Sequence, residues 1–415
     1  MSAVPGLPVL AAANKSQIKD LQVVLEKAMQ GGGAVQFPAG RFAVSGLTIT
    51  APLQISGVPG LTLLSSGSGK PILIIDGAAD VTISGIAFDG GDAPPADDFS
   101  LVVAKDAKGL VIENCRFTVS KGNGLRLEGC AGRISGNHFS DIARTALFAR
   151  NSKGLEISGN RLDGIGNNGI QVWTSEPTED GTMVVNNRIS RVAATDGGTG
   201  QNGNGINVYK AGNVMVSGNR ISDCAFSAIR NNAGSNCQIQ NNSISRTGEV
   251  AIYCEFGFEG AIVSGNLIED VALGISITNF NEGGRLATVA NNVIRKVKGG
   301  GTLPDTSGVG IGAEADAVVT GNVIEEAADS GISLGWGSYC RNLAASGNLL
   351  RNCRRGIVFS VTGGADAVQI SNNRISGSTD GSIIGSDHGS PQTADLGVAG
   401  AEAPPGVMIS GNLVN

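Results

Sequence analysis

Short runs of alternating apolar and polar residues recur through most of the chain. Each run follows a small residue, as in GLRL (124–127), GIQV (169–172), GINV (205–208), GISI (274–277) and GISL (331–334). Alternation with a period of two is typical of a β-strand with one buried face. A second motif, Gly or Asn followed by Asn, any residue and an apolar residue, lies about nine residues before these runs. Each repeat therefore predicts two short strands separated by turn residues.

The asparagine of this second motif recurs eleven times, at Asn137, Asn160, Asn187, Asn219, Asn242, Asn266, Asn292, Asn322, Asn348, Asn373 and Asn412. The spacing falls as low as 23 residues, which suits one coil of a parallel β-helix. Stacked asparagine side chains can donate to and accept from one another along such a stack. Asparagine also tolerates left-handed turn geometry. We therefore interpret the eleven asparagines as scaffold, and we expect an all-β solenoid of about a dozen coils with Ile, Val and Leu inside.

A solenoid needs its exposed ends covered. Residues 16–30 predict an amphipathic helix because apolar residues recur there at helical spacing, namely Ile18, Leu21, Val24, Leu25 and Ala28. Gly31, Gly32 and Gly33 would end it. We expect residues 1–35 to form an N-terminal segment with a capping helix, and residues 36–415 to form the β-helix.

The composition argues against several classes of binding partner. The net charge of −6 gives no electrostatic reason to bind nucleic acid, and no run of 18 apolar residues could span a membrane. The seven cysteines form no CxxC pair and there are only two histidines, so we expect no metal and no cofactor. We interpret the cysteines as small, buried apolar residues.

The helix followed by GGGAVQFPAGRFAVSGLTI and the asparagine coils resembles the pectate-lyase-like right-handed parallel β-helix proteins. Further stretches resemble an uncharacterised family of twin-arginine-translocated repeat proteins, among them GNNGIQVWTSE (166–176), GEVAIYCEFGFEGA (248–261) and GISITNFNEGGRLA (274–287). The resemblance implies a right-handed β-helix and a periplasmic or extracellular location. No Arg-Arg pair precedes the helix, and residues 1–13 lack the basic region of a signal peptide, so we expect the signal to have been removed.

Outward positions of the strands gather the aromatic residues of a chain that is only 4% aromatic. Such rings beside polar groups suit the flat faces of sugars, although they could also shield the sheet or contact a neighbouring chain. We expect a groove walled by the loops 174–183 and 279–286. Its substrate-binding candidates are Gln171, Trp173, Glu176, Asn207, Tyr209, Lys210, Asn232, Thr278, Asn279, Arg285 and Trp336.

Two acids on this face suggest hydrolysis. Glu255 and Glu314 occupy equivalent outward positions two coils apart, or about 9.6 Å between backbones, near the upper limit for the carboxylates of inverting glycosidases. Phe256 and Phe258 could desolvate Glu255 and favour its protonated form. We expect Glu255 as the acid and Glu314 or Glu282 as the base.

Two alternatives stay open. Arg230 and Tyr253, with Tyr209 and Lys210, could run β-elimination or C5-epimerisation of a uronate polymer. The protein could also bind a glycan or belong to the envelope without catalysis. In every case we expect a polysaccharide or oligosaccharide as the partner, and association into oligomers is possible. His388 is expected to lie in a plain loop and to be dispensable.

Overall fold

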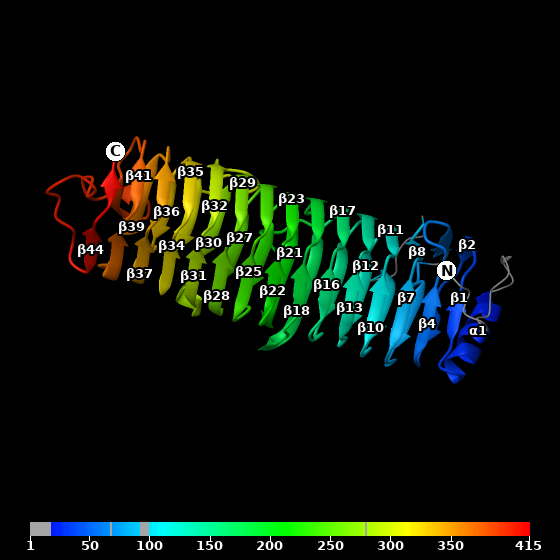
Figure 1. Ribbon diagram of the computed structural model, residues 1–415. Helices are drawn as coiled ribbons and strands as arrows, with labels where there is room; N and C mark the ends of the chain where they lie inside the picture. The colour runs from blue at the N-terminus through cyan, green and yellow to red at the C-terminus, as the bar shows by residue number, and fades with distance from the viewer. Residues whose placement is uncertain (1–17, 67–68, 92–98, 279) are drawn as a thin grey trace. The chain divides into compact units, whose positions relative to one another are not determined.

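The structure is a computed structural model that describes residues 18–66, 69–91, 99–278 and 280–415. It forms two compact units, which meet in the sequence between Ile206 and Asn207. Within each unit the chain winds in coils of three short strands, and each strand pairs in parallel with the corresponding strand of the next coil (Figure 1). We name the sheets A, B and C in the order in which a coil visits them. Each unit is therefore a parallel β-helix, as the repeats predict, but the two strands predicted for each repeat are wrong, because each coil contains three.

The strands of unit 1 follow this order throughout. Sheet A contains β1 (Ala34–Gln36), β4 (Leu53–Ser56), β7 (Val81–Ser84), β10 (Leu110–Glu113), β13 (Gly132–Ser135), β16 (Glu156–Ser158) and β19 (Met183–Val185). Sheet B contains β2 (Gly40–Ala43), β5 (Thr62–Ser65), β8 (Ala87–Asp89), β11 (Arg116–Ser120), β14 (His138–Ile142), β17 (Arg161–Ile165) and β20 (Arg188–Val192). Sheet C contains β3 (Leu47–Ile49), β6 (Leu73–Asp76), β9 (Ser100–Lys105), β12 (Asn123–Glu128), β15 (Thr145–Arg150) and β18 (Asn168–Glu179).

Strand β21 (Asn204–Gly212) contains the boundary, and unit 2 repeats the same order after it. Sheet A contains β22 (Met215–Ser217), β25 (Cys237–Gln240), β28 (Glu259–Ser264), β31 (Arg285–Ala290), β34 (Ala317–Thr320), β37 (Arg341–Ser346), β40 (Asp366–Ser371) and β44 (Val407–Ser410). Sheet B contains β23 (Arg220–Cys224), β26 (Ser243–Thr247), β29 (Leu267–Val271), β32 (Val293–Val297), β35 (Val323–Ala327), β38 (Leu349–Arg351), β41 (Arg374–Ser376) and β45 (Leu413–Val414). Sheet C contains β24 (Ile229–Asn232), β27 (Val250–Glu255), β30 (Leu273–Ile277), β33 (Val309–Ala313), β36 (Ser330–Leu334), β39 (Arg355–Ser360), β42 (Ile383–Asp387) and β43 (Ser390–Pro391), and β43 runs antiparallel to β42.

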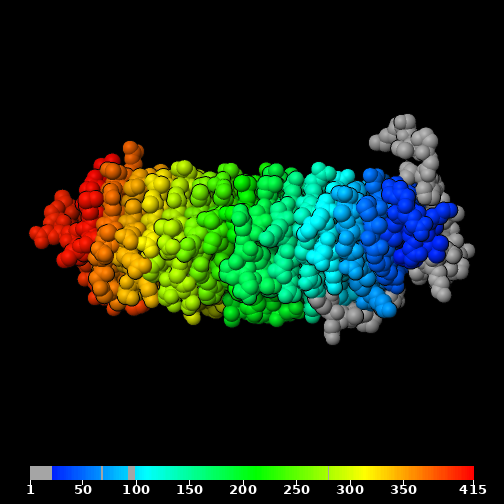
Figure 2. All heavy atoms as spheres, turned by 90° about the horizontal axis from the view of Figure 1, so that it is seen from below, coloured from blue at the N-terminus to red at the C-terminus, as the bar shows by residue number. Residues whose placement is uncertain are grey.

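Inward side chains stack from coil to coil. The parallel pairing is in register, so Ile268 of β29 lies beside Ile294 of β32 and both are fully buried. In unit 1 the rings of Phe88, Phe117 and Phe139 stack with centroids 5.2 and 4.6 Å apart. Burial of such columns supplies the main driving force for folding, because each coil alone cannot cover its own apolar face. Figure 2 shows the outer surface of the coils as successive bands of colour within each unit.

The asparagines form the predicted ladder. The side-chain oxygen of Asn292 accepts from the backbone N–H of Asn266 at 3.0 Å and from its side-chain amide at 2.9 Å. The Asn292 amide in turn donates to Asn322 at 2.9 Å and to the carbonyl of Val263 at 3.1 Å. The left-handed position was expected at the asparagine itself but belongs to the residue before it, for example Asn291 (φ 57°). The buried asparagine bridges coils, and its neighbour makes the turn.

The capping helix is α1 (Ile18–Gln30). It contacts β1 and β3, with Leu21 and Leu25 buried, and the Gln22 side chain bonds both backbone groups of Thr48. The helix ends where the N–H of Gly33 donates to the carbonyl of Ala28 at 2.9 Å. Among the described residues, no helix has the length and apolar character needed to span a bilayer.

All seven cysteines are buried and unpaired, as the interpretation as small hydrophobes predicts. Burial raises the pKa of the Cys115 thiol to about 12 and that of Cys340 to about 11. Neutral thiols are poor nucleophiles, so these side chains serve as packing atoms.

Candidate functional site

A groove lies on the outer face of sheet C in unit 2, and small side chains create it. Tyr253, Ser276, Gly312, Ser333 and Val358 occupy the same outward position on five successive strands. The three middle residues are short, and a Cβ added at Gly312 would meet no atom within 4 Å. The hollow that results has a volume of about 730 Å³ and extends toward the coils after Val358. We call it the sheet C groove.

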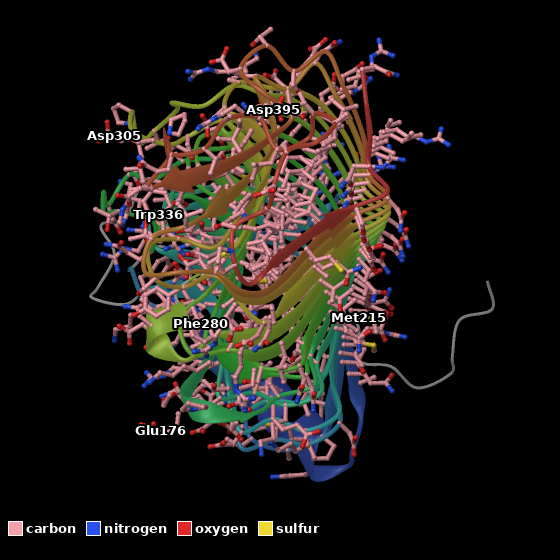
Figure 3. All side chains as sticks on the ribbon, turned by 90° about the vertical axis from the view of Figure 1, so that its left-hand side faces the viewer. Glu176, Met215, Phe280, Asp305, Trp336 and Asp395 are labelled. Carbon is pink, nitrogen blue, oxygen red and sulfur yellow. The ribbon has the colours of Figure 1, made fainter. Side chains whose placement is uncertain are left out.

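Two loops contribute to the rim of the groove. Asp305 and Ser307 come from the loop between β32 and β33, and residues 388–391 come from the turn between β42 and β43. Viewed along the coils, Asp305, Trp336 and Phe280 project from one side of unit 2, whereas Met215 of sheet A projects from the other (Figure 3). The groove thus has its rim on the aromatic side of the unit.

Trp336 is the large aromatic side chain in the groove and is half exposed. A tight turn presents it, because the backbone groups of Trp336 and Tyr339 bond each other at 3.0 Å in both directions. The His388 ring meets the Trp336 ring edge to face, with centroids 5.2 Å apart. His388 Nδ1 lies 2.5 Å from Asp387, whose other partner is the Thr362 hydroxyl, also at 2.5 Å. These hydrogen bonds, that of Thr362 first, lower the pKa of Asp387.

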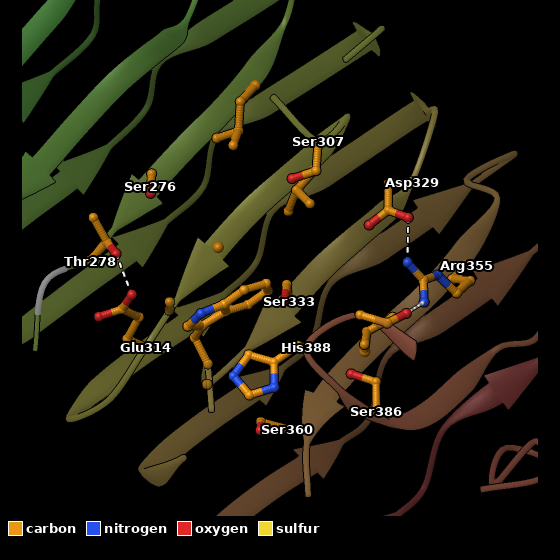
Figure 4. A pocket seen from close by; sticks show the side chains of 18 of the residues that line it. Ser276, Thr278, Ser307, Glu314, Asp329, Ser333, Arg355, Ser360, Ser386 and His388 are labelled. Atoms are coloured by element: carbon orange, nitrogen blue, oxygen red, sulfur yellow. Dashed lines mark hydrogen bonds and ion pairs between the residues drawn. The ribbon is translucent and has the colours of Figure 1, made fainter. Parts of the chain in front are cut away.

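Glu314 is held by two donors. The Thr278 hydroxyl donates to one carboxylate oxygen, and the backbone N–H of Phe280 donates to the other at 2.8 Å. Phe280 opens the short 3₁₀ helix η1 (Phe280–Glu282). Two donors of this kind fix the orientation of the carboxylate. Figure 4 shows the Thr278 hydroxyl bonded to Glu314, and His388 on the same side of the groove.

An ion pair occupies the other end of the groove. Arg355 binds Asp329 through one guanidinium nitrogen and the carbonyl of Gly389 through another at 2.7 Å (Figure 4). Neighbouring Arg354 binds Asp380 at 2.6 Å. The Arg355 side chain is buried and its contacts tie the 388–391 turn to the coil beneath, so its first role is to position that part of the rim.

A family model described as the right handed beta helix region matches residues 62–189 and 178–309, which together cover more than half of the chain. The chain belongs to this right-handed β-helix family. No curated protein matches it in sequence. Among solved structures it is similar to PfbA, a surface adhesin of Streptococcus pneumoniae, with 14% identity, a TM-score of 0.52, and 92% and 93% of the two chains covered. It is also similar to the catalytic domain of a GH87 alpha-1,3-glucanase in complex with nigerose, with 14% identity, a TM-score of 0.52, and 99% and 70% covered. At this identity the likeness shows the β-helix fold.

Five residues were predicted to be catalytic, and of these Glu314 alone lines the sheet C groove of this β-helix protein. Glu255 has the predicted register, two strands from Glu314. Its two oxygens, however, bind the Nε and Nη2 atoms of Arg230 at 2.5 and 2.9 Å, and Asn232 donates to it at 2.9 Å. Glu255 is buried by this pairing. Of the two rings expected to desolvate Glu255, Phe258 is buried and Phe256 is exposed.

The residues predicted for a lyase are, like Glu255, already paired with other side chains. Arg230 also approaches Glu249 at 3.3 Å and lies over the Tyr253 ring at 5.0 Å, so its donors already have partners. Burial raises the pKa of Tyr253 above its ordinary value, and Glu255 raises it further. A base needs the opposite shift to act near neutral pH. Arg230, Glu249 and Glu255 therefore form ion pairs with one another, and this cluster lies on the outer face of the sheet.

The predicted binding residues fall in several places. Thr278 and Trp336 line the groove. Glu282 and Arg285 are exposed, and Arg285 pairs with Glu259, while Asn279 lies outside the described residues. Lys210 lies 5.3 Å from the Tyr209 ring, and Asn207 is buried. In unit 1, Gln171 is buried and accepts from Thr145, Trp173 packs on Phe148 and Glu176 is exposed.

The rim of the groove differs from the expectation. Residues 174–179 extend strand β18, because the N–H of Ser175 donates to Asn151 at 2.8 Å, and they do not form a loop. His388 was expected in a plain loop, yet it lines the groove against Trp336. Asp329 and Arg355 were also missed. The register of neighbouring coils sets Ser330 opposite Arg355 and so would have brought Asp329 within one residue of Arg355, but nothing periodic in the sequence places His388.

No group of three or more His, Cys, Asp or Glu side chains within the described part of the chain is arranged to hold a metal ion. The chemistry available in the groove is that of a carboxylate, an Asp-His pair and an aromatic face.

Proposed function

We propose that this β-helix protein binds a carbohydrate chain in the sheet C groove of unit 2 and hydrolyses a glycosidic bond there. One observation carries the proposal: the exposed Trp336 ring lines an open groove that also contains an oriented carboxylate, and it contacts a histidine that is paired with an acid. Aromatic faces stack on sugar rings, and a carboxylate can act as the base that activates a water for attack on the sugar carbon. The family resemblance implies that the glycan is met outside the cytoplasm.

The residues divide the reaction between them. Glu314, oriented by Thr278 and Phe280, takes a proton from the attacking water. His388, whose Nδ1 is occupied by Asp387, presents Nε2 beside Gly337 and gives its proton to the leaving oxygen. Asp387, whose pKa is lowered by its hydrogen bonds to Thr362 and His388, holds the ring in this orientation through Nδ1. Water supplies the hydroxyl for the sugar carbon, and both products leave neutral.

The first test combines a glycan panel that includes an alpha-1,3-glucan with three variants. Trp336→Ala removes the stacking surface and Gly312→Leu fills the floor, and each is expected to weaken binding by about tenfold or more, or about 1.4 kcal/mol. Glu314→Gln keeps the shape and is expected to retain binding while lowering the rate of cleavage by about 100-fold or more. Binding is measured by calorimetry and cleavage by newly formed reducing ends.

The matched control for Gly312→Leu is Ser243→Leu, which adds the same side chain to the exposed outer face of sheet B. Full binding by both Trp336→Ala and Gly312→Leu would move the site elsewhere. Binding without cleavage by the wild-type protein would leave the groove as a non-catalytic glycan site. Unsaturated uronate products would instead favour a lyase. We do not expect them, because the donors of Arg230 already bind Glu255 and Glu249.

A further inference from the structure

The outer face of sheet B in unit 2 carries an aliphatic column that its own chain does not cover. Leu267, Val293, Val323 and Leu349 lie side by side on four successive strands and are 39–46% exposed. These strands, β29, β32, β35 and β38, follow one another along sheet B (Figure 1). The same position is polar at each end of the column, with Ser243 before it and Arg374 after it. The column is therefore a bounded feature of four coils.

Sheet A widens the apolar surface. Ile262 and Val318 point outward from β28 and β34 and are 43% and 41% exposed. Val318 precedes Val323 by five residues, with Thr320 and Gly321 between them, and Thr288 separates Ile262 from Val318 along sheet A. Exposed apolar side chains gathered on one side of a folded protein mark an interaction site. We call these six residues the aliphatic ridge.

A column of alternating charge runs beside the ridge. Two residues along each strand stand Glu269, Arg295, Glu325 and Arg351, again in register. Arg295 binds Glu269 at 2.7 Å and Arg351 binds Glu325 at 2.9 Å within the chain. The following left-handed positions repeat the alternation with Asp270, Lys296, Glu326 and Asn352. These pairs account for the alternation within one chain but leave the aliphatic column uncovered.

The order of these charges is self-complementary under a two-fold axis. An axis parallel to the strands, passing between β32 and β35, reverses the order of the coils while keeping each column opposite itself. It places Glu269 opposite Arg351 of a second copy and Arg295 opposite Glu325, and it brings the aliphatic columns together. Packing with the coils in the same direction would instead set like charges face to face. Isologous contacts of this kind are the commonest in soluble oligomers.

We propose that the aliphatic ridge is the contact surface of an antiparallel homodimer in which sheet B of unit 2 packs on sheet B of a second copy. A sugar would need aromatic or hydrogen-bonding groups that the ridge lacks. An anionic membrane would need a basic surface, whereas these columns balance their charges. The dimer leaves the sheet C groove open, so it does not depend on the function proposed for that groove.

The first experiment measures mass. Light scattering and sedimentation of the full chain, from about 1 μM to about 100 μM, are expected to show twice the 41.9 kDa of one chain. Val293→Glu/Val323→Glu places charges at the centre of the ridge and is expected to weaken association by about tenfold or more. The matched control, Met183→Glu, changes an exposed residue of sheet A in unit 1 and should stay dimeric.

Charge reversal separates the dimer from a ladder that acts only within the chain. Glu325→Arg alone sets Arg295 against an arginine of the partner and should weaken the dimer. Adding Arg295→Glu restores opposite charges across the axis, although it leaves like neighbours within each chain. Recovery of the dimer in the double variant supports the proposal, and equal loss in both variants contradicts the predicted axis.

Cysteine pairing tests the direction. Leu267→Cys and Leu349→Cys proteins, mixed with oxidised glutathione, should form a disulfide between the two variants, whereas neither should link to itself. Within one chain these positions are three coils apart, beyond the reach of a disulfide. Links within each variant would show packing in the same direction, and a wild-type chain that stays monomeric at every concentration would overturn the proposal.

Discussion

An outward position on a β-helix strand does not determine whether its side chain meets solvent. Glu255 and Glu314 point outward at equivalent positions two coils apart. Glu255 is buried beneath its contacts with Arg230 and Asn232, whereas Glu314 lines a groove because the residues beside it are Ser and Gly. Neighbours one coil away therefore decide the role of each charged residue. The same rule applies to charge pairs in unit 1.

Asp163 provides a test of such a pair. Arg191 binds both of its oxygens at 2.7 and 2.6 Å, and this hydrogen bonding, with a smaller contribution from Ser190, lowers the pKa of Asp163 to about 2. The stabilisation is present above the unfolded pKa of about 3.9 and is lost as the pH falls through about 2. Because Arg191 is largely exposed, Asp163→Asn should cost only about 0.5–1 kcal/mol at neutral pH.

Thermal unfolding of the wild type and Asp163→Asn at several pH values checks this, and the gap between them should shrink between about pH 4 and about pH 2. Arg191→Ala in either background completes a double-mutant cycle, and little further loss is expected in the Asp163→Asn protein. A gap that is independent of pH would show that the pair contributes through packing instead of charge.

At the scale of the element, the ladder asparagines replace backbone pairing where the chain turns from sheet A to sheet B. Asn292 satisfies the N–H of Asn266 and the carbonyl of Val263, two groups that would otherwise be buried without partners. Leaving such groups unsatisfied costs about 1–3 kcal/mol each. The ladder is thus a structural requirement of every coil that it crosses.

Asn292→Ala should therefore lower the free energy of unfolding of unit 2 by about 3 kcal/mol or more. The neighbouring exposed Asn291, with φ 57°, needs only a residue that accepts the left-handed conformation, so Asn291→Gly should cost little. Chemical denaturation of both variants compares the two positions. Equal costs at Asn291 and Asn292 would show that turn geometry, and not the ladder, sets the requirement.

Much at this scale could be predicted from the sequence, because each coil repeats the same local problem. The spacing of the asparagines and the GIQV-type runs predicted two of the three strands of each coil and the ladder, and the outward position of Glu314 followed from alternation, with Trp336 one residue after the equivalent position. The groove itself could not be located in this way. Its hollow depends on Ser276, Gly312 and Ser333 being small together, and its rim comes from turns near Asp305 and His388 that follow no period.

At the scale of the whole molecule, an open strand edge invites association with another chain, and α1 covers the first coil of unit 1. Leu25 is buried within this contact, whereas Val23 is 60% exposed on the opposite face of the same helix. The helical spacing of Leu21 and Leu25 predicted the cap from sequence. The pair Leu25 and Val23 therefore offers two positions on one element with opposite roles.

Leu25→Asp should detach α1, lower the free energy of unfolding by about 3 kcal/mol or more, and promote aggregation through the uncovered strands. Val23→Asp introduces the same charge on the solvent side and should leave both properties nearly unchanged. Thermal unfolding followed by light scattering measures the two effects together. Aggregation of the Val23→Asp protein alone would contradict the assignment of the buried face.

The buried thiols can report where the stacked coils of each unit separate from one another. Cys115 and Cys130 lie in unit 1, and Cys224, Cys237, Cys254, Cys340 and Cys353 are distributed along unit 2. Because each thiol is buried and out of reach of solvent, an alkylating reagent reacts with a given cysteine only when its own coil separates from its neighbours. The order in which the seven become labelled is then the order in which the coils come apart, from fraying ends to the most persistent centre.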